Sequence, residues 1–336
     1  MAENTITLAH GSGGRAMSQL IEDLFRCAFD NPWLNQGNDC AVMDSPPGRL
    51  VMATDSHVIT PLFFPGGDIG SLAVHGTLND VAMSGGKPIS LSVAFILEEG
   101  FPLADLERIV RSMADAARQA GVPVVTGDTK VVPRGQADGV YITTTGLGRV
   151  SEGVNIAGSR ARPGDAILVS GTLGDHGVAI LSLRENLQFQ TTLESDTAAL
   201  HELVASMLAA VPDIHCLRDP TRGGLSCCLH ELAQQSGVGM IIEEAQLPVR
   251  EAVAGACELL GLDPLNVANE GKLVAICPGH QAQALLAALH HHPLGREAAI
   301  IGQVVEDAHG LIRLKTRYGG MRHVEWLAGE ALPRIC

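Results

Sequence analysis

Apolar and polar residues alternate along the first half of the chain with the periods of both helices and strands. Leu106, Ile109, Val110 and Met113 recur at helical spacing, which predicts an amphipathic helix over residues 102–120. Short apolar runs bounded by polar residues or glycine predict strands around it. The other elements predicted in this half are helices over 17–29 and 69–83 and strands over 51–54, 89–97, 122–125 and 141–150.

A stretch rich in Gly, Ser, Arg and Pro over 153–164 separates this half from a second half with the same alternation. There the pattern predicts strands over 166–170, 240–243, 272–277 and 299–305, and helices over 177–185, 198–209, 224–235, 251–260 and 281–290. Alternation in both halves indicates an α/β fold in which helices cover two sheets. A length of 336 residues suits two domains, expected over 1–155 and 156–322, with a mobile tail over 323–336.

Charge and hydropathy exclude several classes of partner. A net charge of −14 argues against nucleic acid, whose binding depends on Lys and Arg at the phosphates. No apolar run reaches the ~20 residues that a membrane span needs, so we expect no membrane association. The first residues, Met-Ala-Glu-Asn-Thr, lack the basic and apolar regions of a signal peptide. We therefore expect a cytoplasmic protein.

The cysteines point to the C-terminus rather than to a metal. The chain has eight, and no two form a C-x-x-C pair, so structural zinc is not expected. The run His290-His291-His292 beside Pro293 is interpreted as a solvated loop. Cys336 is the last residue, and a terminal segment interrupted by Pro333 can carry a thiol into a pocket. Taken alone, a terminal cysteine in a chain with eight is more readily explained as accidental, and the motifs described below reverse that interpretation.

Acidic residues occur where predicted elements meet loops. Asp39, Asp55, Asp80 and Asp128 stand in the sequences NDC, TDS, NDV and GDTK. The carboxyl ends of strands are the usual ligand-binding edge of an open α/β sheet. Carboxylates that converge there need a cation, and Mg²⁺ binds through one or two carboxylates together with nucleotide phosphates. Each Asp alone is also a common turn residue, but the four together favour a magnesium–nucleotide site.

Two glycine-rich segments add candidate phosphate contacts. The first, 10–16, contains Gly11 and Gly13 and only partly matches a dinucleotide fingerprint, so we interpret it as a phosphate cover and not as an NAD site. The second, 218–224, precedes a predicted helix, whose first N–H groups would meet an anion together with Arg222. No Walker-type motif is present in the sequence. Glu270, in the sequence NEGK, is a candidate general base or a turn residue.

Taken together, these motifs resemble the aminoimidazole-ribonucleotide synthetase superfamily. The resemblance covers the chain from Leu8 to Cys336, and the ending Pro-Arg-Ile-Cys resembles one branch, the hydrogenase maturation factors. It implies a two-domain PurM-like architecture that dimerises through its N-terminal domains, with ATP bound near that interface. It implies ATP and Mg²⁺ as cofactors. The carbamoyltransferase HypF and an iron scaffold of HypC and HypD are the partners implied.

The resemblance also implies a reaction and roles for the candidate residues. HypF would place a carbamoyl group on Cys336, ATP would phosphorylate the carbamoyl oxygen, and loss of phosphate would leave a thiocyanate that donates cyanide to the iron of [NiFe]-hydrogenase. Glu270 is the expected base, and Lys130 would neutralise the developing oxyanion or help to deprotonate. The other expected roles are magnesium binding by Asp55, Asp80, Asp128 and, more weakly, Asp39, and nucleotide or substrate contacts from Asn79, Gly127, Thr129, Arg222, Gly11 and Gly13.

Two other functions remain open on the sequence. A small-molecule enzyme of the same superfamily, such as a purine-type synthetase or a thiamine-phosphate kinase, would leave Cys336 dispensable. A scaffold protein for hydrogenase assembly would use the aspartates structurally. The density of acidic motifs favours an enzyme over the scaffold.

Overall fold

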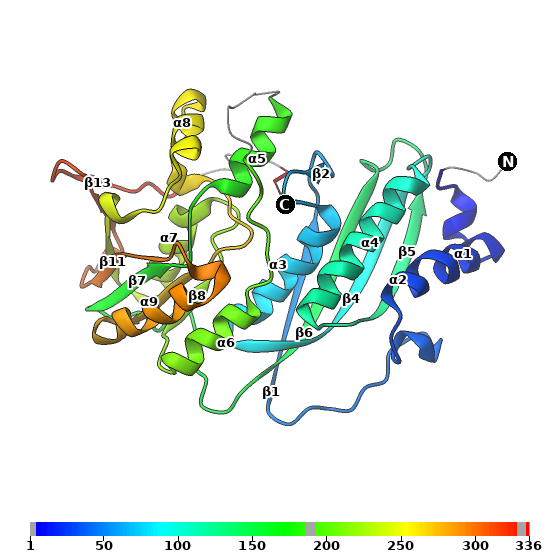
Figure 1. Ribbon diagram of the computed structural model, residues 1–336, viewed down its shortest axis with the longest axis horizontal. Helices are drawn as coiled ribbons and strands as arrows, with labels where there is room; N and C mark the ends of the chain where they lie inside the picture. Colours follow the sequence, from blue (N-terminus) through cyan, green and yellow to red (C-terminus); the bar gives the residue numbers. More distant parts are fainter. Residues whose placement is uncertain (1–4, 186–192, 328–333, 336) are drawn as a thin grey trace.

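A computed structural model describes residues 5–185, 193–327 and 334–335. The chain forms two lobes side by side, each built on one sheet (Figure 1). The 151–164 segment, between β6 and β7, joins the lobes. The mixture of α-helices and β-strands confirms the predicted fold class.

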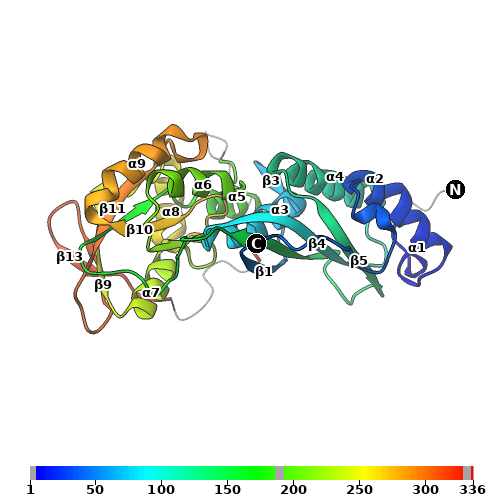
Figure 2. The ribbon, with the colours of Figure 1, turned by 90° about the horizontal axis from the view of Figure 1, so that it is seen from below.

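The sheet of the first lobe has four strands in the order β1-β6-β4-β5. β6 is antiparallel to both of its neighbours, and β4 and β5 are parallel, so β1, β4 and β5 all run in one direction. Helices α3 and α4 cover one face of this sheet (Figure 2). The bounds are β1 Arg49–His57, α3 Ile69–Met83, β4 Gly86–Glu98, α4 Leu103–Ala120, β5 Val124–Val132 and β6 Val140–Val150.

The burial of these elements follows their sequence patterns. Leu106, Ile109, Val110 and Met113 of α4 are fully buried, as their spacing predicted. β6 alternates strictly between buried and half-buried residues, which shows that only one of its faces is covered. α3 is buried almost all round because it packs on the sheet on one side and on the second lobe on another. This central helix places its side chains at the boundary between the lobes.

The sheet of the second lobe has seven strands in the order β13-β12-β9-β11-β7-β10-β8. Helices α6 and α9 pack on one face, and α7 packs on the other. The strands are β7 Asp165–Val169, β8 Cys216–Arg218, β9 Gly239–Glu243, β10 Val274–Pro278, β11 Ala299–Val305, β12 Ile312–Lys315 and β13 Met321–His323. The helices are α5 Asp175–Arg184, α6 His201–Ala210, α7 Gly224–Ser236, α8 Glu251–Leu260 and α9 Ala282–His291.

The N-terminal helix and a small hairpin complete the described structure. The helix predicted over 17–29 is present as three joined pieces, with a wider π-helical turn over Ile21–Arg26. The bounds are α1 Arg15–Leu20, α2 Cys27–Phe29, β2 Phe63–Phe64 and β3 Gly67–Asp68. Within the described residues, no helix is both long enough and apolar enough to cross a membrane.

The positions expected for the acidic motifs need one correction. Asp55 and Asp128 do not follow their strands but lie inside β1 and β5, which continue to His57 and Val132. The strands are longer than their apolar runs because one face of the sheet carries Ser and Thr side chains that are not buried.

Candidate active site

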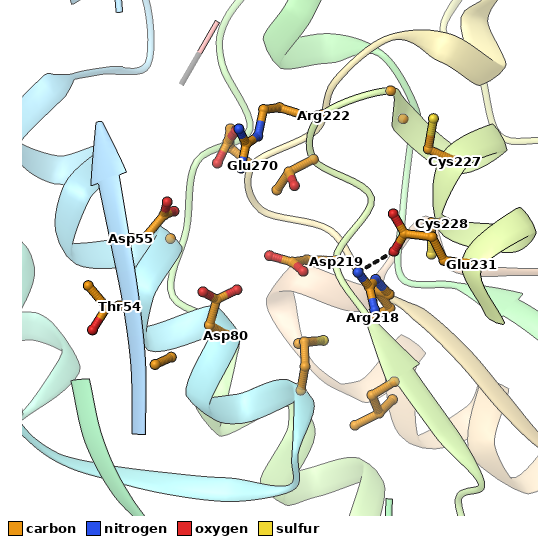
Figure 3. A pocket seen from close by; sticks show the side chains of 17 residues that line it. Thr54, Asp55, Asp80, Arg218, Asp219, Arg222, Cys227, Cys228, Glu231 and Glu270 are labelled. Carbon is orange, nitrogen blue, oxygen red and sulfur yellow. Dashed lines mark ion pairs between the residues drawn. The ribbon is translucent and has the colours of Figure 1, made fainter. Parts of the chain in front are cut away.

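A cavity of about 810 Å³ lies between the two lobes. One wall comes from β1 and α3, and the other comes from the loop after β8 and the first turn of α7 (Figure 3). Asp55, Asp80, Asp219 and Glu270 direct their carboxyl groups into it, and Arg222 lines it from the opposite loop (Figure 3). The cavity therefore brings four acidic side chains together with the guanidinium of Arg222, just before the N-terminus of α7.

Close packing of α3 on β1 fixes the position of Asp55. A side chain at Gly76 would lie 3.0 Å from Nε2 of His57 and 3.5 Å from Oδ2 of Asp55, so only glycine leaves room for both. Nε2 of His57 lies 3.4 Å from Oδ2 of Asp55. Burial lowers the pKa of His57, which keeps the ring neutral despite the opposing effect of Asp55. His57 thus positions Asp55 without neutralising its charge.

Burial and neighbouring carboxylates disfavour the charged forms of the other carboxyl groups in the cavity. Burial, with the neighbouring Asp219 and Asp55, raises the pKa of Asp80 to about 7. Burial is also the main reason that the pKa of Asp219 is raised to about 6. Glu270 is buried, and burial followed by repulsion from Asp219, Asp196, Asp55 and Asp80 raises its pKa well above the ordinary value. A cation that joins such a cluster favours the ionised forms of its carboxyl groups.

The cluster is suited to a cation that arrives with a phosphate ligand. Within the described ranges, no three His, Cys, Asp or Glu side chains are placed to hold a metal ion by themselves. Mg²⁺ requires only one or two protein carboxylates when phosphate oxygens complete its coordination. Asp55 and Asp80 therefore fit the predicted role, and Asp219 joins them as a further candidate.

Asn79 holds Glu270 and does not face a ligand. Its Nδ2 donates to the carbonyl oxygens of Ala198 (3.0 Å) and Glu270 (3.1 Å), and its Oδ1 accepts from the N–H of Leu200 at 2.8 Å. Both amide hydrogens are used by main-chain groups, so the expected contact from Asn79 to substrate or nucleotide is not supported. The side chain instead ties α3 of the first lobe to the Glu270 segment of the second.

The loop before α7 has the backbone expected of an anion site. Gly223 and Gly224 have φ angles of +74° and +61°. A side chain on Gly224 would lie 2.6 Å from the carbonyl oxygens of Leu265 and Val267. These glycines let the chain turn so that α7 begins at the cavity, where Arg222 also lies.

The remaining predicted residues gather elsewhere, around β5. Asp128 and Lys130 form an exposed ion pair with Nζ 3.2 Å from Oδ2. β6 and β4 separate β5 from β1, and at about 4.8 Å per strand this puts Asp128 roughly 14 Å from Asp55. Asp39 is exposed in the segment before β1 and does not line the cavity. Within one chain, Asp128 and Asp39 do not join Asp55 and Asp80.

The glycines near β5 have packing reasons for lacking a side chain. A Cβ on Gly11 would lie 2.7 Å from the main-chain nitrogen of Val131, and one on Gly127 would lie 2.4 Å from the carbonyl oxygen of Val93. Gly13 has a φ angle of +78°. Thr129 is buried beside them. The close approach of Gly11 to Val131 brings the 10–14 segment against β5, and the phosphate contact from Gly11 and Gly13 stays a prediction.

Cys336 lies outside the described residues, but the two residues before it that are described are held in place. Ile335 is buried, and Arg334 pairs with Asp138. The carbonyl oxygen of Ile335 accepts from Nε2 of His176 at 2.7 Å.

Sequence reasoning missed Asp219 and His57 as parts of the site. Asp219 precedes Pro-Thr-Arg-Gly-Gly, and that sequence was interpreted only as an anion loop. The available signal was its position directly after β8, Cys216–Arg218, which is too short to show an apolar period. His57 lies two residues after Asp55 on the same face of β1, which strand alternation reveals once the strand is known to continue.

Comparison with known proteins first identifies the class. A model of the N-terminal domain of AIR synthase related proteins matches residues 37–150, and a model of their C-terminal domain matches residues 162–315. The fold and the acidic cavity between the lobes therefore belong to an AIR synthase related protein.

Full-length relatives narrow this assignment. The chain is 66% identical over 336 residues to carbamoyl dehydratase HypE of Azotobacter vinelandii, covering 100% of this chain and 98% of that protein. A crystal structure of hydrogenase maturation protein HypE in complex with ATP matches with a TM-score of 0.95 and 52% identity, covering 99% and 100% of the two chains. A HypE–HypF complex matches with a TM-score of 0.81 and 47% identity over 92% and 99%. The chain belongs to the HypE family.

Proposed function

We propose that this protein is an ATP-dependent carbamoyl dehydratase that acts on an S-carbamoyl group at its own Cys336. The observation that carries the proposal is the interlobe cavity, where four carboxyl groups face Arg222 and the N-terminus of α7. That combination suits Mg²⁺ and a transferring phosphate. Relatives named carbamoyl dehydratase HypE, and a HypE crystallised with ATP, support the same activity and cofactor.

The reaction needs a phosphate because an amide oxygen is a poor leaving group. The carbamoyl oxygen attacks the γ-phosphorus of ATP, the new O–P bond forms, and ADP leaves as the nitrogen loses one proton. Loss of the second N–H proton then forms the C≡N bond while the C–O bond breaks and phosphate departs. The products are a thiocyanate on Cys336, ADP and phosphate, so the net change at the thiol is loss of one water.

Glu270 is the proposed base for these protons. Its Oε1 has no hydrogen-bond partner among the described residues, so it is available to a ligand in the cavity. Its raised pKa favours the protonated form, and a base must be ionised. Arg222, which lines the same cavity, and Mg²⁺ held by Asp55 and Asp80 would supply the positive charge that restores the carboxylate. Activity should therefore depend on nucleotide and metal binding before proton transfer.

Two separated clusters in one chain support a homodimer. Met52 (71% exposed) and Leu50 (54%) on β1 and Ile96 (41%) on β4 are large apolar residues at the surface of the first sheet. Met52 and Ile96 share the face that α3 and α4 leave open. Asp128 and Lys130 lie on this same face of β5, beside Ala94 and Ile96. β1 and β5 are the two edges of the sheet, and edges of this kind are usually paired or covered.

A second copy would complete the site. A two-fold axis parallel to the strands would stack the open faces with β5 of one copy over β1 of the other, and an isologous interface would repeat this contact. Lys130 and Asp128 of the second copy then approach the cavity that holds Asp55 and Glu270. The arrangement retains the predicted roles of Lys130 as a neutralising group and Asp128 as a metal ligand.

The proposed partners follow from the substrate. HypF supplies the carbamoyl group, and a HypE–HypF complex among the structural relatives supports this contact. The HypC–HypD scaffold receives the cyano group on iron for [NiFe]-hydrogenase, in the cytoplasm. The domain limits at 155 and 322 belong to the same proposal.

Phosphate release by carbamoylated protein tests this function. Cys336→Ser should abolish HypF-dependent phosphate release while Mg-ATP binding and the melting temperature stay unchanged. Cys27→Ser, which alters an exposed cysteine away from the tail, is the matched control. Turnover that persists without Cys336 would indicate the small-molecule enzyme instead.

A further inference from the structure

Arg334 and Ile335, the last described residues of the chain, are held by contacts with the rest of the protein. Ile335 is 1% exposed and belongs to the same buried cluster as Ile59, Phe64 and Ile180. A residue next to a chain terminus is rarely buried unless contacts hold it there. We propose that His176 is the positioning residue of a receptor that binds the Arg334-Ile335 dipeptide and so fixes where Cys336 is presented.

His176 is oriented to bind a main-chain carbonyl. It lies fully buried in the first turn of α5, with its ring edge-on to Phe64 at 5.7 Å between centroids. Its Nε2 lies 2.7 Å from the carbonyl oxygen of Ile335, which can only accept, so Nε2 carries the hydrogen. Burial lowers the pKa of His176, so the ring is neutral and Nδ1 accepts from Oγ of Ser195 at 2.7 Å.

Contacts from both lobes hold Arg334. Its carbonyl oxygen accepts from the N–H of Thr60 at 3.4 Å and from the guanidinium of Arg184. Its side chain pairs with Asp138. Thr60 and Asp138 belong to the first lobe, and Arg184 and His176 belong to the second. The dipeptide therefore lies across the boundary between the lobes.

The backbone of Arg334 indicates a specific fit. Its φ angle of +54° falls in the left-handed region, and no other non-glycine residue in the described ranges has a positive φ. Such a conformation is unfavourable for a side chain with a Cβ and persists where surrounding contacts require it. The hydrogen bonds to the carbonyl oxygens of Arg334 and Ile335 supply that requirement.

A short segment links the receptor to the cavity. Oγ of Ser195 contacts His176, and Oδ1 of Asp196 accepts from the N–H of Glu270 at 3.0 Å. Oδ2 of Asp196 lies 3.1 Å from Nζ of Lys272, which fixes the carboxylate. Adjacent residues thus hold the docked tail and the proposed base, so docking sets the position of Cys336 relative to Glu270. This consequence rests on the proposed function, whereas the receptor itself does not.

Digestion by carboxypeptidase Y, followed by intact mass, tests the receptor on the full-length protein. The enzyme must bind several terminal residues in extended form, so removal of Cys336 requires Arg334 and Ile335 to leave their site. His176→Leu, which loses the hydrogen bond, should speed removal about tenfold. Ile335→Ala should also speed removal of Cys336, because the tail loses its buried side chain. This substitution changes the tail and leaves the residues that surround it unaltered.

Two variants distinguish the loss of the hydrogen bond between His176 and the tail from a general loss of stability. His176→Gln retains an N–H donor at the place of Nε2 and should restore removal close to the wild-type rate. His230 is the matched control because its Nε2 lies 3.0 Å from the carbonyl oxygen of Val324, earlier in the same tail. His230→Leu should leave removal of Cys336 unchanged. A wild-type rate in both His176→Leu and Ile335→Ala, with melting temperatures preserved, would overturn the receptor.

The link to the cavity has its own readout. In carbamoylated protein, His176→Leu should slow loss of water from Cys336 about tenfold while the half-saturating Mg-ATP concentration stays the same. Unchanged water loss despite faster digestion would leave the receptor in place and contradict its positioning role. Absence of water loss in the wild-type protein would instead count against the proposed function.

Discussion

Asn79 donates a hydrogen bond to the carbonyl oxygen of Glu270 across the boundary between the two lobes, with 3.1 Å between Nδ2 and O. The same side chain binds main-chain groups of Ala198 and Leu200. One buried amide of α3 thereby sets the position of the proposed base relative to the acidic groups of the first lobe.

Replacing Asn79 with alanine should destabilise the protein by about 2–4 kcal/mol, because three buried main-chain groups lose their partner. Urea unfolding followed by circular dichroism measures this difference. Asn35→Ala, at an exposed position that pairs with Asp30, should change stability by less than about 0.5 kcal/mol. Equal effects of the two substitutions would contradict the role of Asn79.

The sequence predicted the periodic elements more reliably than the short ones. Helices Ile69–Met83 and Glu251–Leu260 and strand Ala299–Val305 are confirmed with the predicted bounds. β8, β12 and β13 were missed because three or four residues carry too little alternation to be recognised.

The sequence predicted most of the acidic residues but not which of them lie together, because that depends on contacts between segments far apart in the chain. The separation of Asp128 from Asp55 depends on the strand order β1-β6-β4-β5, which periodicity does not encode. The hydrogen bond from Asn79 to the carbonyl oxygen of Glu270 depends on where the second lobe packs against α3. Local sequence identifies the acidic residues, whereas pairing across the chain decides which of them meet.

Asp80 and Asp219 should stabilise the nucleotide-free protein less as pH rises from about 5.5 to 7.5. The folded pKa of Asp80 is about 7 and that of Asp219 about 6, both above their ordinary value of 3.8. The folded state therefore binds protons that the unfolded state has released, and this stabilising effect is lost as pH passes the folded pKa values. Urea midpoints across this range measure it.

Asp80→Asn should remove the contribution of Asp80, so the difference in urea midpoint between this variant and the wild type should change with pH. Saturating Mg-ATP should reduce that change by compensating the charge of Asp80. A midpoint difference that stays constant between pH 5.5 and 7.5 would contradict the raised pKa of Asp80.

Glu270→Gln should lower the rate of water loss by about 10²–10⁴-fold, the range expected when a general base is removed. The amide retains the size of the side chain but cannot take up the protons. Mass spectrometry of the C-terminal peptide in a single turnover measures the rate. Glu202→Gln, an exposed change on α6, should behave as the wild type, and activity of Glu270→Gln above a tenth of wild type would assign the base to another group.

Mixed dimers test whether Lys130 acts on the cavity of the other copy. Glu270→Gln and Lys130→Met chains should each be inactive, but a heterodimer keeps one cavity with both native residues. Random reassortment should restore about a quarter of wild-type activity, since half of the dimers have one of two sites intact. No recovery, with subunit exchange shown by mass spectrometry, would place Lys130 and Glu270 in the same chain's site.

Intact mass with C-terminal peptide mapping, after incubation with HypF, carbamoyl phosphate and Mg-ATP, tests the central claim most directly. The account predicts a carbamoyl adduct on Cys336 that loses the mass of one water only when Mg-ATP is present. A tail that remains unmodified beside active HypF, or an adduct that keeps its water with Mg-ATP bound, would contradict it.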